Sequence, residues 1–77
     1  MVVDIYAHIL RPGRVGDYFV IVSAFPFDSQ ESIGNQPQKA RTATTLQEAE
    51  TTRSELVQSL QEIVEERGDV VRQVHFK

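Results

Sequence analysis

The sequence has no cysteine at all among its 77 residues, and it has few prolines and glycines. The lack of cysteine excludes a disulfide framework, a thiolate nucleophile and any cysteine-based metal or redox site. No apolar stretch approaches the roughly 20 residues that a membrane-spanning helix needs, and no basic segment followed by an apolar run marks a signal peptide. We therefore expect a cytoplasmic protein that does not insert into a membrane, folded as a single domain over residues 1–77.

Positive charge is also scarce. Eight Lys and Arg residues stand against eleven Asp and Glu residues, which gives a formal net charge of −3, and the basic residues are scattered along the chain. A nucleic-acid-binding protein usually gathers its basic side chains into one patch that faces the phosphates. We therefore do not expect a nucleic-acid partner. A nucleic-acid adaptor is kept as an alternative, in which an oligomer would pool Arg11, Arg14, Lys39 and Arg41.

The longest regular pattern runs from Thr45 to Gly68 and predicts one long amphipathic helix. Thr45 and Glu48 have the spacing of a capping box, in which each side chain can satisfy a backbone N–H at the helix start. Gly68 supplies a stop signal. Apolar residues recur between them at helical spacing and predict one buried face. The predicted buried residues are Leu46, Ala49, Leu56, Val57, Leu60, Ile63 and Val64.

Arg53 interrupts this apolar stripe at a position where a buried residue is expected. One interpretation is that its aliphatic stem lies on apolar surface while the guanidinium stays in solvent. The other is that the guanidinium pairs with a carboxylate, either Glu50 or one from another subunit.

Two segments near the N-terminus predict a β-hairpin. Side chains alternate along residues 2–10, residues 18–25 are almost all β-branched or aromatic, and a proline, two glycines and charged residues separate the two segments. A pairing centred near Gly13 and Arg14 would place Ile9 opposite Tyr18 and Ala7 opposite Val20.

The rest of the chain predicts a loop and two further strands. Residues 26–37 are rich in turn-forming residues and predict a mobile surface loop. Residues 38–44 alternate weakly and predict an edge strand, because their charges discourage further pairing. Residues 70–76 predict the last strand, with Val70, Val74 and Phe76 on one face and Val71, Gln73 and His75 on the other. The predicted fold is therefore α+β in the order β-β-β-α-β, with a single antiparallel sheet and one helix packed on one face.

The second face of the predicted hairpin is unusually apolar for a surface in contact with water. Because one helix can cover only one face of a sheet, we expect another protein surface to cover this one. The predicted interface residues are Tyr6, His8, Phe19, Ile21 and Phe25, and the expected partner is a second copy of the chain or another protein. The alternative is that the aromatic residues form cross-strand pairs on a face that stays in solvent.

The sequence contains no recognisable catalytic, cofactor or metal constellation. His8 and His75 are on different predicted strands, and neither has a second ligand at metal-binding spacing. Asp4 and His8 share a strand face, but four residues of strand separate them by about 13 Å, which excludes a direct dyad. We therefore expect a non-catalytic protein. The enzyme alternative requires a site formed between chains, with His8 or His75 contributed by each copy.

In its order of elements, the chain resembles the small antitoxin-type domains of the HicB-like family. The resemblance is carried by Tyr18-Phe19-Val20 in the second strand, Phe25-Pro26 at its end, and Thr45-Leu46-Gln47-Glu48-Ala49 at the helix start. Family members usually follow the Phe-Pro pair with an Asp-Leu-Pro-Gly type turn, where this chain has Phe27-Asp28-Ser29-Gln30 and a longer loop. The resemblance implies a domain that oligomerises and binds a protein partner.

Overall fold

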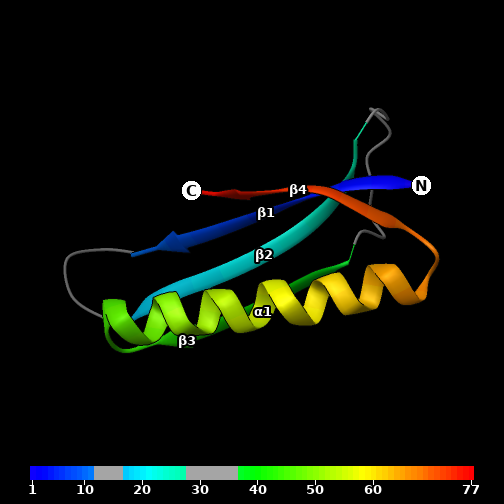
Figure 1. Ribbon diagram of the computed structural model, residues 1–77. Helices are drawn as coiled ribbons and strands as arrows, with labels where there is room; N and C mark the ends of the chain where they lie inside the picture. The colour runs from blue at the N-terminus through cyan, green and yellow to red at the C-terminus, as the bar shows by residue number, and fades with distance from the viewer. Residues whose placement is uncertain (12–16, 28–36) are drawn as a thin grey trace.

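The computed structural model describes residues 1–11, 17–27 and 37–77 (Figure 1). Its elements are β1 (Val2–Leu10), β2 (Tyr18–Pro26), β3 (Gln38–Ala43), α1 (Leu46–Glu66) and β4 (Val70–Phe76). The four strands form one sheet, and α1 lies across one of its faces. The predicted α+β class and the order β-β-β-α-β are confirmed. Residues 12–16 of the predicted turn and 28–36 of the predicted loop lie outside the described residues.

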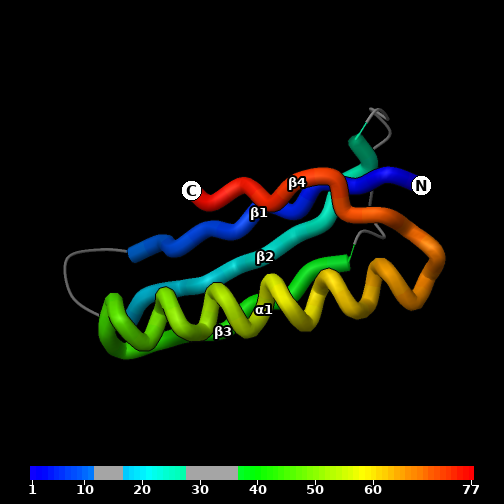
Figure 2. Tube along the Cα trace, in the orientation of Figure 1, coloured from blue at the N-terminus to red at the C-terminus, as the bar shows by residue number. Residues whose placement is uncertain are grey.

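The sheet is mixed, which corrects the expectation of a single antiparallel sheet. Its strand order is β3-β2-β1-β4, and β4 runs parallel to β1 while the other neighbouring pairs are antiparallel. The helix is the reason. It carries the chain back from the end of β3 to the start of β4 (Figure 2), so β4 runs in the same direction as β3 and β1. The predicted position of β3 at the sheet edge is confirmed.

The β1–β2 pairing is offset by two residues from the predicted register. Ile9 lies opposite Val20 instead of Tyr18, and Ala7 lies opposite Val22 instead of Val20. Register depends on the length and type of the turn, which the turn-forming residues between the strands do not specify. Because side chains alternate with a period of two, an even offset keeps every residue on its predicted face. The faces were therefore predicted correctly, and the cross-strand neighbours were not.

The hydrophobic core lies between the sheet and α1. Its largest fully buried side chains are Ile5, Val20 and Val22 from the sheet and Leu60 and Val64 from the helix. The buried helix residues are Ala49, Thr52, Leu56, Val57, Leu60 and Val64.

Two members of the predicted helix stripe are not buried. Leu46 is 51% exposed, because it is the first residue of α1 and has a helical turn on one side only. Ile63 lies at the side of the stripe and is half-buried. Thr52 occupies the buried face instead, at 5% exposure.

Arg53 is half-buried, and its guanidinium carbon lies 4.9 Å from the centre of the Phe76 ring. The guanidinium meets an aromatic face, and its Nε is buried without a hydrogen-bond partner among the described residues, so the guanidinium does not stay fully in solvent as the first interpretation expects. Within the described ranges, none of the ion pairs involves Arg53. The interpretation that paired it with Glu50 is therefore not the arrangement of the single chain.

The two ends of α1 carry the predicted Thr45 cap and Gly68 stop, but within the described residues the Glu48 side chain does not bind a backbone N–H as the predicted capping box requires. The hydroxyl of Thr45 accepts a hydrogen bond from the backbone N–H of Glu48 at 3.1 Å, which makes Thr45 the N-cap. The carboxylate of Glu48 accepts a hydrogen bond from the Thr44 hydroxyl at 2.8 Å, one residue before the cap. At the other end, Gly68 adopts a φ of 88°, in the left-handed region that favours glycine.

A β-bulge in β4 changes which residues face the core. Val71 pairs with Val3, and Gln73 pairs with Asp4, so Arg72 is an extra residue between two successive pairs. One added residue inverts the alternation of side chains. Val71 and Val74 consequently both pack against the core. The prediction that placed them on opposite faces was wrong, because sequence alternation alone does not reveal a bulge.

Candidate protein interface on the open sheet face

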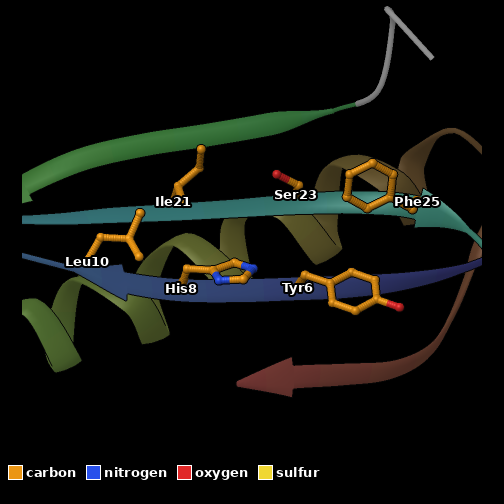
Figure 3. Close-up of a pocket in the computed structure, with 6 residues that line it drawn as sticks. All are labelled: Tyr6, His8, Leu10, Ile21, Ser23 and Phe25. Carbon is orange, nitrogen blue, oxygen red and sulfur yellow. The ribbon is translucent and has the colours of Figure 1, made fainter. Parts of the chain in front are cut away.

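The sheet face opposite α1 is not covered by any element of the described chain, and we call it the open face. Figure 3 shows it with the helix behind the sheet. Its residues follow from the strand register, which places every second side chain on this side. They are Val2, Asp4, Tyr6, His8, Leu10, Phe19, Ile21, Ser23, Phe25, Gln38, Ala40, Thr42, Val70, Gln73, His75 and Lys77.

A shallow groove of about 620 Å³ runs over β1 and β2 on the open face. Its lining residues are Tyr6, His8, Leu10, Ile21, Ser23 and Phe25, and all of them stand on the side of the sheet away from α1 (Figure 3). Four of the five predicted interface residues therefore lie together in the groove.

The fifth predicted residue, Phe19, is on the same face beside the groove. It lies opposite Leu10 in the register and is 36% exposed. Leu10 and Ser23 were not among the predicted interface residues, although strand alternation already placed both of them on this face. The signal for them was present, but their residue types are less conspicuous than aromatic ones.

The open face carries very little charge. Asp4 is the one Asp or Glu among the open-face residues and is paired with the Arg72 guanidinium, and Lys77, at the register position opposite His8, adds one positive charge. The two basic residues of β3 stand on the helix side, where Arg41 pairs with Glu55 at 3.4 Å. Depletion of charged side chains is typical of the centre of protein–protein interfaces.

Asp4 is 4% exposed, and its charge is neutralised within the chain. Arg72 donates two hydrogen bonds to it, from Nε to Oδ1 at 2.9 Å and from Nη2 to Oδ2 at 2.7 Å. These hydrogen bonds hold the pKa of the Asp4 carboxyl below its usual range, although burial acts in the opposite direction. The same contact raises the pKa of Arg72. The bulge at Arg72 makes this bidentate pair possible, because it brings that residue beside Asp4.

Aromatic rings surround this ion pair. The rings of Tyr6 and His75 stack with centroids 4.4 Å apart, and Phe25 meets Tyr6 edge-on at 5.8 Å. The Arg72 guanidinium lies 3.9 Å from the centre of the Phe27 ring. These contacts join β2, β1 and β4 across the open face, and they fix the side chains at one end of the groove.

The structure brings together Asp4 and His75, which the sequence analysis did not connect. His75 Nε2 lies 3.5 Å from Asp4 Oδ2, yet it makes no hydrogen bond with any described residue. No local pattern could have indicated this contact, because it depends on β4 pairing with β1. As predicted, His8 is not close to Asp4, since both are on β1 and four residues apart.

The arrangement does not bring Ser23 and His75 together as a nucleophile and its base. Ser23 and His75 lie on opposite sides of Tyr6 in the register, two strands apart, which separates them by about 10 Å. A serine at that distance is beyond the hydrogen-bond reach that a nucleophile and its base require. In the part of the chain that the structure describes, no cluster of three or more His, Asp or Glu side chains could hold a metal ion.

Within residues 1–11, 17–27 and 37–77, no helix has the length and apolar character needed to cross a membrane. A scan of protein-family models, a search of curated proteins and a search of solved structures find no match to this chain. The resemblance to the HicB-like family therefore depends on its short motifs, and the groove and the charge distribution of the open face are the observations from which a function can be argued.

Proposed function

We propose that this protein is a non-catalytic interaction module that self-associates through its open face. The observation that carries the proposal is the apolar groove on a sheet face that no described element covers. Large apolar side chains on this face reach solvent, with Leu10 at 50%, Phe25 at 44% and Phe19 at 36% exposure. Contiguous apolar surfaces of this kind mark interaction sites, because their burial is favourable.

The charge distribution favours a second copy of the chain as the partner. The chain has a formal net charge of −3, and most of its glutamates are on α1. Two copies that met through their helices would bring those carboxylates together. The open face instead carries one carboxylate that Arg72 neutralises. Two open faces therefore bring fewer like charges together than two helices would.

The dimensions of the sheet are compatible with a dimer. The strands have nine, nine, six and seven residues and are about 26 Å long on average, and four strands about 4.8 Å apart cover about 19 Å, which gives about 490 Å² per copy. Two such faces would bury about 1,000 Å², somewhat less than the roughly 1,200 Å² at the lower end of specific interfaces. The protruding rings of Phe19 and Phe25 increase this area. We infer a sheet-to-sheet dimer with a two-layer apolar interior.

The substitution Phe19→Glu tests this proposal. It places a carboxylate on the open face of each copy. A symmetric dimer would bury both carboxylates away from water, which is unfavourable, so we expect the assembly to dissociate into monomers. Sedimentation velocity over a concentration series measures the shift in mass.

The matched control is Leu46→Glu, which adds the same charge at an exposed leucine of the helix start. This variant should associate like the unmodified chain. A monomeric unmodified chain at the highest soluble concentration would contradict self-association, and equal dissociation by both variants would show that net charge, not the open face, controls the mass.

A second candidate is the binding of a different protein by the same face, the role that the HicB-like resemblance implies. The motifs around Phe25 and Thr45 favour it. It predicts that the unmodified chain stays monomeric and that Phe19→Glu abolishes complex formation with the partner. The two alternatives of the sequence analysis have less support. Asp4 is held by Arg72, which weakens an enzyme site using His75, and Arg41 is paired with Glu55, which weakens a basic surface for nucleic acid.

A further inference from the structure

The two histidines of the open face have different electrostatic surroundings. His75 stacks on Tyr6 and lies 3.5 Å from the Asp4 carboxylate. His8 is in the groove, opposite Ile21 of β2, and among the described residues no carboxylate pairs with it. A protonated His75 would therefore lie beside the Asp4 carboxylate, whereas a protonated His8 would have no carboxylate beside it among the described residues.

The ionisable groups nearest His8 do not offer it a counter-charge. On its own strand, Asp4 is about 13 Å away and bound to Arg72. Beyond β4, the backbone N–H of Lys77 donates to the Ala7 carbonyl, and the Lys77 carbonyl accepts from Ile9, which places Lys77 at the register position opposite His8. The side chain of that lysine is positively charged and does not offer a counter-charge to a protonated imidazole.

The neighbouring strands and the helix do not change this picture. The open-face residues of β2 nearest His8 are Phe19, Ile21 and Ser23, none of which becomes negatively charged. Asp17 is the nearest acidic residue on that side, and it precedes β2 by one residue, about 13 Å along the strand from Ile21. The glutamates of α1 are on the other side of the sheet.

We propose that association through the open face is controlled by pH, and that protonation of His8 is the event that separates the two copies. The inference rests on the proposed self-association. A second copy presents the same open face, whose one carboxylate is held by Arg72. Each His8 enters a surface of apolar side chains when the dimer forms, and a charged imidazole there lacks a partner. Dimerisation therefore requires both imidazoles to be neutral.

The size of the effect follows from proton linkage. If the dimer accepts no proton on either His8, dissociation is coupled to the uptake of up to two protons, and the dissociation constant rises by at most about 100-fold for each pH unit. Asp4 does not contribute to this change, because its pKa lies below its usual range and the carboxylate stays ionised.

The experiment measures the dimer dissociation constant by sedimentation equilibrium at about pH 7.5 and about pH 5.5. The unmodified chain is compared with His8→Gln, which cannot take up a proton, and with His75→Gln as the matched control on the same face. We expect His8→Gln to dimerise equally at both pH values, and His75→Gln to keep the large rise at the lower pH. His8→Phe, which replaces the imidazole by an apolar ring, provides a second non-titrating variant in case the amide weakens the dimer.

The outcomes separate this inference from the proposed function. A monomer at about pH 7.5 overturns self-association and this inference with it. A dimer whose dissociation constant is the same at both pH values leaves self-association standing and overturns the role of His8. A pH response that persists in both His8 variants and disappears in His75→Gln assigns the effect to the other histidine and also overturns the inference.

Discussion

At the scale of single residues, Asp4 and Arg72 form the contact on which the junction of β1 and β4 depends. They are 68 positions apart in the sequence, and the bulge in β4 brings them together. The carboxylate is almost fully buried, and it accepts two hydrogen bonds from a guanidinium that also lies on the Phe27 ring. Removal of Arg72 would leave the buried Asp4 with an unpaired charge, whereas removal of Asp4 would leave a guanidinium that is 42% exposed.

We expect Asp4→Asn to lower the thermal unfolding midpoint at neutral pH, because an amide cannot replace the two charge-assisted acceptors. The pKa of Asp4 is lower in the folded chain than in an unfolded one, where an aspartate titrates near 3.9. The stabilisation by the carboxylate is therefore fully present above about pH 4 and is lost as the pH falls through the folded-state pKa. The midpoints of the variant and the unmodified chain should converge in acid.

Thermal unfolding followed by circular dichroism at neutral and at acidic pH provides the measurement. Asp17→Asn is the matched control, since Asp17 is exposed and should leave the midpoint nearly unchanged. A midpoint difference for Asp4→Asn that is the same at every pH would mean that the side chain stabilises the fold by its shape and not by its charge.

At the scale of elements, the helix shows which buried residues sequence periodicity can predict and which it cannot. The apolar spacing identified one buried face, and the structure confirms Ala49, Leu56, Leu60 and Val64 on it. Spacing does not report how many neighbours surround each position, so Leu46 was placed in the core although it is exposed at the helix start. Thr52 was not predicted to be buried because the pattern counts only apolar residues, and threonine is polar.

Two leucines of the helix therefore make a matched pair. Leu60 is fully buried, and Leu60→Ala should lower the free energy of unfolding by about 2–5 kcal/mol, because it removes buried methyl groups and leaves a cavity. Leu46→Ala makes the same chemical change at an exposed position and should cost less than about 0.5 kcal/mol. Urea unfolding of both variants measures the difference. Similar losses for the two would show that the burial of the helix face is wrongly assigned.

The strands show a different limit of sequence analysis. The faces of β1 and β2 could be predicted because alternation is a local property, whereas the faces of β4 were wrong on one side of its bulge. Strand direction, register and the bulge at Arg72 could not be predicted, because each is decided by segments far apart in the chain. The Asp4, Arg72 and His75 cluster was missed for this reason, whereas Tyr6 and Ile21 of the groove were found.

At the scale of the whole molecule, the balance of surfaces is the main property that the sequence allowed us to predict. One helix covers one face of a four-stranded sheet, and the opposite face keeps Tyr6, Ile21 and Phe25 without a covering element in the described chain. A domain of this size buries a modest fraction of its surface, so an additional interface would add substantially to its stability. The composition of one chain indicates that such a surface exists, but it does not report what binds there.

The parallel pairing of β1 with β4 also determines how the molecule should respond to force. Residues 1 and 77 lie at opposite ends of these two neighbouring strands (Figure 1). Tension applied between them would slide one strand along the other, so that all the hydrogen bonds of the pair bear the load at once. Tension between residues 1 and 69, which lie at the same end and are joined by an ion pair of 3.4 Å, would open the bonds one after another. Optical-tweezer measurements should therefore find a higher rupture force in the first geometry, and equal forces would mean that another part of the fold yields first.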